Sequence, residues 1–299
     1  MLEGAGVQIC ACSSSRVIFR PRHHSPLIII TPRSSTGRTI GAGVRVDPFL
    51  MLDELKLPAG KASAGFPDHP HRGMATCTIM LAGRMEHRDS IGNSGIIKGG
   101  GVQWMEAARG IIHSEHPVAE DPNELLHGFQ LWVNLPAAHK MGKPRYQDIQ
   151  ADAIPAIHND GNGTVRVLAG EWNGAVGPIQ VHHSHKVLLL DVVLDQRGRF
   201  STGLEKRYNC FVYVYAGNGT VGDAEAETET AYVVGEKETA EQELSIEAGA
   251  DGLRCLVVAG EPINEPVVQH GPFVMNTLDE INQAFFDYRS GNFARDDIE

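Results

Sequence analysis

Alternating apolar and polar positions, separated by glycine turns, dominate this 299-residue chain from about residue 41 onward. In Gly128–Asn134 every second side chain is apolar (Phe129, Leu131 and Val133), as in a strand that buries one face. Comparable patterns predict strands at Met74–Leu81, Val102–Met105, Thr164–Ala169, Val187–Leu194, Phe211–Tyr215, Ala231–Val234, Leu244–Ile246 and Leu253–Ala259. Short strands between glycine turns predict an all-β protein.

Three other segments interrupt this pattern. Gly95–Gly101 is rich in glycine and predicts a turn, whereas Ala137–Ile154 is charged and predicts a linker between two units. In Asp279–Tyr288 the apolar residues fall on one helical face, which predicts a short C-terminal helix. The expected division is therefore an N-terminal unit at 39–150, a C-terminal unit at 151–290 and a tail at 291–299.

Residues 1–38 read as an extension outside the fold. Residues 1–40 contain five Arg, one Glu and several Ser, which fits either a disordered segment or an organellar targeting peptide. The five Cys form no recognisable disulfide framework, so a reducing compartment such as the cytoplasm or nucleus is expected.

The overall charge restricts the partners. The formal net charge is -11 at pH 7, and this acidic balance argues against direct binding to nucleic acid, which would favour a basic stripe. The apolar run Leu27–Ile30 is far too short to cross a bilayer, so no membrane segment is expected. An apolar content of 42% is enough for a sizeable core.

Two short clusters carry the candidate chemistry: His69-Pro70-His71 and His113-Ser114-Glu115. Side chains two positions apart on a strand share a face, so each cluster can present two ligands to one ion. Three imidazoles and one carboxylate suit Fe(II), Mn(II), Ni(II), Co(II), Cu(II) or Zn(II). The competing interpretation, histidines without metal, is weakened by the presence of two such pairs in a glycine-rich β context.

Other histidines receive a less specific interpretation. The segment His182–His185 contains a second H-x-H spacing, but no matching pair follows it, so a metal site is not expected there. His87, His116 and His127 could line a pocket or face solvent. The chain has no G-x-S-x-G nucleophile elbow and no phosphate-binding G-x-x-x-x-G-K-[ST] loop.

At the two clusters the chain resembles the pirin family of the cupin superfamily. The resemblance covers about residues 40–290 and is carried by 65–73, 102–105, 109–115, 127–136 and 269–277. It implies two stacked cupin barrels, with one mononuclear iron in the N-terminal barrel and no metal in the C-terminal one. The iron ligands that it implies are His69, His71, His113 and Glu115.

The resemblance also implies two alternative functions. The first is a quercetin (flavonol) 2,3-dioxygenase that uses O₂ to cleave the flavonol ring with release of carbon monoxide, with Glu115 as the candidate acceptor of the flavonol proton. The second is a non-catalytic, iron-dependent transcriptional co-regulator that contacts transcription factors. Fe(II) is the expected ion, and a cytoplasmic or nuclear monomer is the expected form.

Three positions depart from the family pattern. Ala75 stands where the family has Glu, Gly101 where Asp is usual, and Ala108 where Gly is usual. From Ala75 we expect a pocket that lacks one carboxylate. These departures leave the identity of the substrate open.

Overall fold

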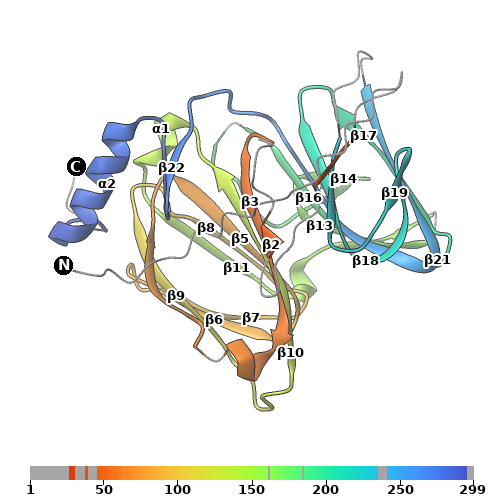
Figure 1. The fold of residues 1–299 in the computed structure, drawn as a ribbon, viewed down its shortest axis with the longest axis horizontal. Coiled ribbons are helices and arrows are strands. Elements are labelled where there is room, and N and C mark those ends of the chain that lie inside the picture. Colours follow the sequence, from red (N-terminus) through yellow and green to blue (C-terminus); the bar gives the residue numbers. More distant parts are fainter. Residues whose placement is uncertain are drawn as a thin grey trace.

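The structure, a computed structural model, describes residues 27–30, 38–39, 46–62, 64–160, 162–183, 185–234 and 241–294. Two β-sheet units lie next to one another, and helix α2 (Leu278–Ser290) packs at the far end of the N-terminal unit (Figure 1). The prediction of an all-β fold with a short C-terminal helix is thus confirmed. Within the described ranges, no helix is long and apolar enough to cross a membrane.

The N-terminal unit is built from two sheets. The larger has the strand order β11-β8-β5-β10-β3-β2, and the smaller has the order β4-β9-β6-β7. The strands of the larger sheet are β2 (Arg38–Thr39), β3 (Phe49–Pro58), β5 (Met74–Ala82), β8 (Val102–Glu106), β10 (Leu125–Asn134) and β11 (Arg145–Ile149). Those of the smaller sheet are β4 (Phe66–His71), β6 (Arg84–Asp89), β7 (Ser94–Lys98) and β9 (Ile111–Pro117).

The C-terminal unit is organised around one sheet of nine described strands. Its central order is β1-β20-β18-β21-β16-β13-β12, with β17 paired to β21 and β19 paired to β18. The strands are β1 (Leu27–Ile30), β12 (Ala156–Asn159), β13 (Gly163–Ala169), β16 (Val187–Leu194), β17 (Arg199–Glu205), β18 (Asn209–Val221), β19 (Ala224–Ala226), β20 (Thr230–Val234) and β21 (Glu241–Gly260). Strand β1 comes from the predicted N-terminal extension, most of which lies outside the described residues.

The remaining elements are short. They are the hairpins β14 (Glu171–Trp172) with β15 (Ala175–Val176) and β22 (Val268–His270) with β23 (Phe273–Met275), helix α1 (Ala137–Lys140), and the 3-10 turns η1 (Ala59–Ala62) and η2 (Ala151–Ala153). Helix α2 begins at a capping box between Thr277 and Glu280 and ends at Gly291, whose φ of 74° suits a glycine C-cap. The C-terminal segment returns to the N-terminal unit. There, Arg72 forms a 2.6 Å ion pair with Asp287 of α2.

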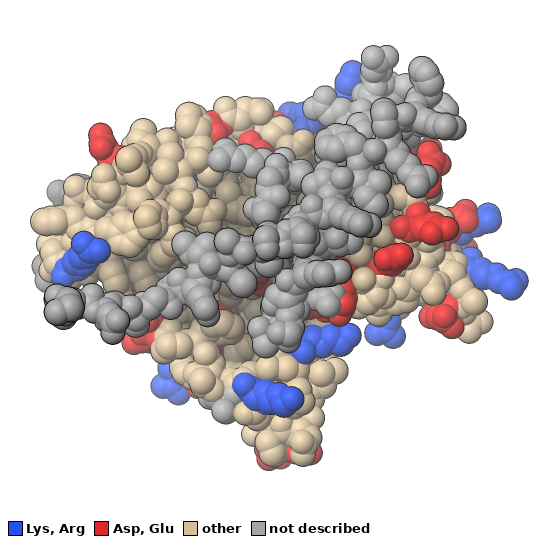
Figure 2. Space-filling model, in the orientation of Figure 1, with Lys and Arg blue, Asp and Glu red and all other residues tan. Residues whose placement is uncertain are grey.

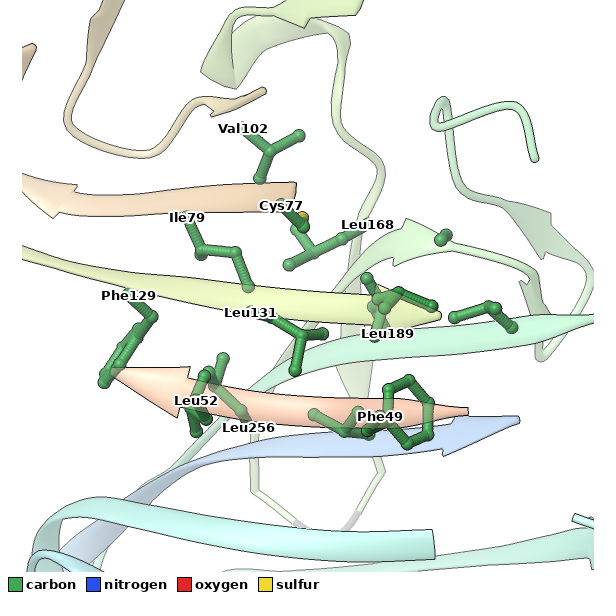
Figure 3. Packing of buried hydrophobic residues seen from close by; sticks show 14 of the residues in the cluster. Phe49, Leu52, Cys77, Ile79, Val102, Phe129, Leu131, Leu168, Leu189 and Leu256 are labelled. Carbon is green, nitrogen blue, oxygen red and sulfur yellow. The ribbon is translucent and has the colours of Figure 1, made fainter. Parts of the chain in front are cut away.

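A shared hydrophobic core joins the two units. Strand β10 contributes Phe129, Leu131 and Val133, and the C-terminal sheet contributes residues such as Leu189 and Leu256, all in one buried cluster. Figure 3 shows Phe129 and Leu131 together with Leu189 and Leu256 between the strands of the two units. The alternation predicted for Gly128–Asn134 therefore buries its apolar face between the units and leaves its other face to the interior of the N-terminal barrel.

Two segment predictions need correction. Gly95–Gly101 is not wholly a turn, because Ser94–Lys98 forms strand β7, and only the last residues turn into β8. The predicted linker Ala137–Ile154 contains helix α1 and strand β11, which pairs with β8 at the edge of the larger sheet. The charged side chains of Arg145–Ile149 masked an edge strand whose partner lies about forty residues earlier in the chain.

Candidate metal centre

The smaller sheet of the N-terminal unit positions the predicted ligands. Strands β4 and β9 pair antiparallel, and this register places His69 directly opposite His113. His71 lies two residues after His69, and Glu115 lies two residues after His113. This spacing keeps the two side chains of each pair on the same face of the sheet. The two clusters separated in sequence therefore meet on one face of one sheet.

The possible ligand atoms form two overlapping groups. In the first, one nitrogen each from His69, His71 and His113 lie within 4.8 Å of one another. In the second, His113 and Glu115 are joined by His87 at the same spacing. His113 belongs to both groups, whereas Glu115 is not grouped with His69 and His71. The four predicted ligands are therefore gathered around His113, with the carboxylate on the side of His87.

Burial makes these imidazoles suitable for a metal. His71 and His113 are 2% and 1% exposed, and burial lowers the pKa of His71 to about 3 and lowers that of His113 further. Both ring nitrogens of His71 and Nε2 of His113 are buried without a hydrogen-bond partner. Neutral, unpartnered nitrogens are costly in a protein interior, and a metal ion would satisfy them. The residues present thus fit a divalent transition metal.

His69 is oriented by the backbone carbonyl of Pro67, two residues earlier in the chain. Its Nδ1 lies 2.8 Å from the carbonyl oxygen of Pro67, so Nδ1 carries the proton and donates it to that oxygen. Nε2 is then unprotonated and available to a metal.

Glu115 is held from the opposite sheet. Thr78 on β5 donates its hydroxyl to Oε1 at 3.2 Å, and Gln130 on β10 donates its amide to Oε2 at 2.9 Å. The carboxylate is 3% exposed. Because each oxygen has a second lone pair, the carboxylate can still accept a proton or a metal bond.

The structure adds a residue that the sequence analysis did not place in the site. His87 on β6 is fully buried and lies opposite Glu115 in the β6–β9 register. A usable signal was present, because His87-Arg88-Asp89 has the same H-x-carboxylate spacing as His113-Ser114-Glu115.

The other histidines lie away from this centre. His127 hydrogen bonds to Glu54 at 2.8 Å, and Tyr213 donates to the same carboxylate at 2.6 Å, so these groups link the two units. The ring of His183 lies 5.9 Å from the rings of His139 and His185. In the described part of the chain, both groups of convergent ligand atoms belong to the N-terminal unit.

Ala75 does not face the candidate site, contrary to the expectation that the pocket loses a carboxylate there. Its side chain packs in the core between the units together with Cys77 and Ile79. The opposite face of β5 carries Thr78, which reaches Glu115. Ala108 adopts a φ of 44°, a left-handed conformation that glycine adopts more easily than alanine.

The lowered pKa of His71 predicts a pH-dependent stability of the metal-free protein. Between pH 6.5 and about pH 3 the unfolded imidazole is protonated while the folded one stays neutral, so stability falls as pH falls. This group contributes about 1.4 kcal/mol per pH unit. Chemical denaturation at several pH values should show a slope about one proton smaller for His71→Gln. The matched control His158→Gln replaces an exposed histidine on β12 and should keep the wild-type slope. An unchanged slope for His71→Gln would contradict the prediction.

Surface charge is mixed on one face of the molecule (Figure 2). On the face drawn in Figure 2, the described Asp and Glu side chains are interspersed with Lys and Arg. The described Lys and Arg side chains form no continuous basic patch on this face. This arrangement gives no support to nucleic-acid binding through that face.

Comparison with known proteins agrees with the fold and the two-unit architecture. The family model Pirin matches residues 30–133, and the model for the pirin C-terminal cupin domain matches residues 189–294. A Pseudomonas aeruginosa protein named "Putative quercetin 2,3-dioxygenase PA3240" is 44% identical over 256 residues, which cover 84% of this chain and 88% of that protein.

Two solved structures illustrate the likeness. A quercetin 2,3-dioxygenase from Acinetobacter baumannii has a TM-score of 0.78 and 31% identity, covering 94% of this chain and 99% of that one. The bacterial pirin YhhW from Escherichia coli, solved in complex with nickel(II), has a TM-score of 0.58 and 23% identity, covering 82% of this chain and 95% of that one. With both family models matched and this sequence identity over most of its length, the chain belongs to the pirin family of the cupin superfamily.

Proposed function

We propose that this protein is a mononuclear metal-dependent dioxygenase that cleaves a quercetin-like flavonol with O₂, with Fe(II) as the resident ion. One observation carries the proposal: buried, neutral imidazole nitrogens without partners converge beside a buried carboxylate. The relatives named as quercetin 2,3-dioxygenases support the substrate class.

His69, His71 and His113 would hold the ion, and Glu115 would complete or flank its coordination. Three neutral imidazoles and one carboxylate leave a divalent ion with a net charge of +1, which favours an anionic ligand such as a deprotonated flavonol. When bound, the metal would supply a Lewis-acidic and redox-active centre at which the deprotonated flavonol reacts with O₂.

Glu115 is the residue that we assign to proton transfer. Thr78 and Gln130 fix its orientation, and the carboxylate is not grouped with His69 and His71. It can therefore act as a weak ligand that takes the proton of the flavonol hydroxyl when the substrate binds.

Burial favours this role. Glu115 is 3% exposed and faces Thr78 and Gln130 of the other sheet, and a buried carboxylate interacts more strongly with a nearby proton donor than an exposed one does. The ring of Trp132 packs 5.1 Å from that of His71 and helps to close the same interior.

Glu115→Gln is expected to lower kcat for quercetin by roughly 100- to 10,000-fold, because the amide keeps the shape but cannot accept the proton. Initial rates of flavonol loss at matched metal content are the measurement. The control Glu86→Gln, on neighbouring β6, should retain the wild-type rate. A Glu115→Gln rate equal to wild type would remove Glu115 from proton transfer.

The dioxygenase proposal itself is tested by aerobic incubation with quercetin. Protein loaded separately with Fe(II), Mn(II), Ni(II), Co(II) or Cu(II) is mixed with the flavonol, and the loss of flavonol absorbance is followed. Turnover with at least one ion is expected, and no turnover with any of them would reject the proposal. The alternative, an iron-dependent co-regulator of transcription factors, stays a prediction, and it requires a partner whose binding changes on His113→Ala.

A further inference from the structure

His87 is a buried histidine next to the proposed ligands that the proposed function leaves without a role. In the antiparallel β6–β9 pair, His87 lies opposite Glu115 and Asp89 lies opposite His113. The two strands thus present an H-x-D and an H-x-E pair to the same interior face. The side chains of both His87 and Asp89 are 0% exposed.

The contact between His87 and His113 specifies where protons lie. Nδ1 of His113 is 3.3 Å from Nδ1 of His87, so one of these nitrogens donates and the other accepts. Nε2 of His113 has no hydrogen-bond partner and is the nitrogen left for a metal. A neutral imidazole that keeps Nε2 unprotonated carries its proton on Nδ1, so His113 is the donor and His87 the acceptor.

Asp89 lies next to His87 on the side away from His113 Nδ1. Once Nδ1 of His87 accepts, its proton resides on Nε2, which lies 3.6 Å from Oδ2 of Asp89 and has no closer partner. Asp89 cannot turn away easily. Its carboxylate accepts hydrogen bonds from the side-chain amide of Asn93 at 2.7 Å and from the backbone N–H groups of Asn93 and Ile91 at 2.8 and 3.1 Å.

We propose that the Asp89–His87 pair is a positioning device that fixes His113 in its Nδ1–H tautomer and aims Nε2 at the metal. Outer partners of this kind orient ligating histidines and make them better donors. This inference rests on the proposed function, because it takes His113 as a metal ligand. It assigns to Asp89 and His87 no contact with substrate.

A purely structural role for His87, in which its ring only packs, predicts different results from the positioning role for the variants His87→Phe and His87→Asn. The ring of His87 stacks on Tyr146, with centroids 4.8 Å apart and an interplanar angle of 28°. His87→Phe keeps a ring for this stacking but offers no acceptor to His113. His87→Asn loses the stacking, yet its side-chain oxygen can occupy the position of Nδ1 and accept the proton of His113. If His87 only packs against Tyr146, His87→Phe should keep the properties of the wild type better. If His87 positions His113, His87→Asn should keep the metal affinity better.

The experiment compares these two variants in Co(II) affinity and in stability. By competition with a chelator, we expect His87→Phe to weaken Co(II) binding by roughly 10- to 100-fold and His87→Asn to stay within about 3-fold of wild type. Chemical denaturation of the metal-free proteins should give the reverse order, with His87→Asn less stable. Tighter Co(II) binding by His87→Phe than by His87→Asn would overturn the proposal.

Two further readouts separate this inference from the fate of the proposed function. In metal-free protein, long-range ¹H–¹⁵N correlation spectra, with His113 assigned by its loss in His113→Ala, should show a proton on Nδ1 of His113. A proton on Nε2 instead would overturn the inference whether or not quercetin is turned over. So would two Co(II) ions per chain, one of which is lost in both His87 variants, since His87 would then be a ligand itself.

Discussion

Replacing His113 by alanine is expected to reduce bound metal from about one ion per chain to less than about a tenth of that value. His113 is the one residue shared by both groups of convergent ligand atoms, and it is 1% exposed. Its loss removes a neutral donor from a buried site and leaves the nitrogens of His71 without the ion that would satisfy them. Elemental analysis after metal loading and gel filtration measures the effect.

His116→Ala is the matched control for that measurement. His116 lies on the same strand, β9, but at odd spacing from His113, so its side chain leaves on the other face. We expect full metal content for His116→Ala. Equal metal content in His113→Ala and wild type would refute the ligand assignment.

Lys140→Met is expected to lower the free energy of unfolding by about 3 kcal/mol. The ammonium of Lys140 is 1% exposed and donates to the carbonyl of Gly73 at 2.6 Å, the side chain of Asn134 at 2.6 Å and the carbonyl of Val274 at 2.9 Å. Methionine fills the space of the stem but leaves these three buried acceptors without a donor. Each such acceptor costs about 1–3 kcal/mol, partly offset because no charge remains buried.

The charge state of Lys140 matters to this prediction. Burial lowers its pKa to about 8, so the side chain remains an ammonium at pH 7, with three N–H donors for three acceptors. These bonds tie the segment after His71 to strand β10 and to β23 of the returning C-terminal segment. Denaturation midpoints at pH 7 should be compared with those of Lys143→Met, which replaces an exposed lysine just beyond the end of α1. A destabilisation no larger than that of the control would show that the three bonds contribute little.

Period-two spacing explains why the convergence of the candidate ligands could be predicted from the sequence. His69 with His71, and His113 with Glu115, are each local pairs, and a strand places both members of a pair on one face whatever the rest of the fold does. The alternation of Phe129, Leu131 and Val133 was equally local, and these residues indeed form a buried row. The helix at the C-terminus followed from its own apolar face and was found as Leu278–Ser290.

The features that could not be predicted from the sequence depend on pairing between strands that are far apart in the chain. His87 belongs to the site only because β6 pairs with β9, and nothing near His87 in the sequence specifies that partner. Strand β11 has no apolar stripe strong enough to distinguish it from a linker, and it is a strand because β8 offers an open edge. Whether Ala75 faces the candidate site or the core depends on which face of β5 the second unit covers. The residues around Ala75 do not specify that face.

The most direct test of the account is the stoichiometry of quercetin oxidation by the Fe(II)-loaded wild-type protein. Flavonol loss, O₂ uptake and carbon monoxide release are measured in the same sealed reaction, with His113→Ala carried in parallel. We expect equal molar amounts of quercetin consumed, O₂ taken up and carbon monoxide released by the wild type, and no reaction above the buffer rate for His113→Ala. Quercetin loss that proceeds equally in both proteins, or without carbon monoxide, would contradict it.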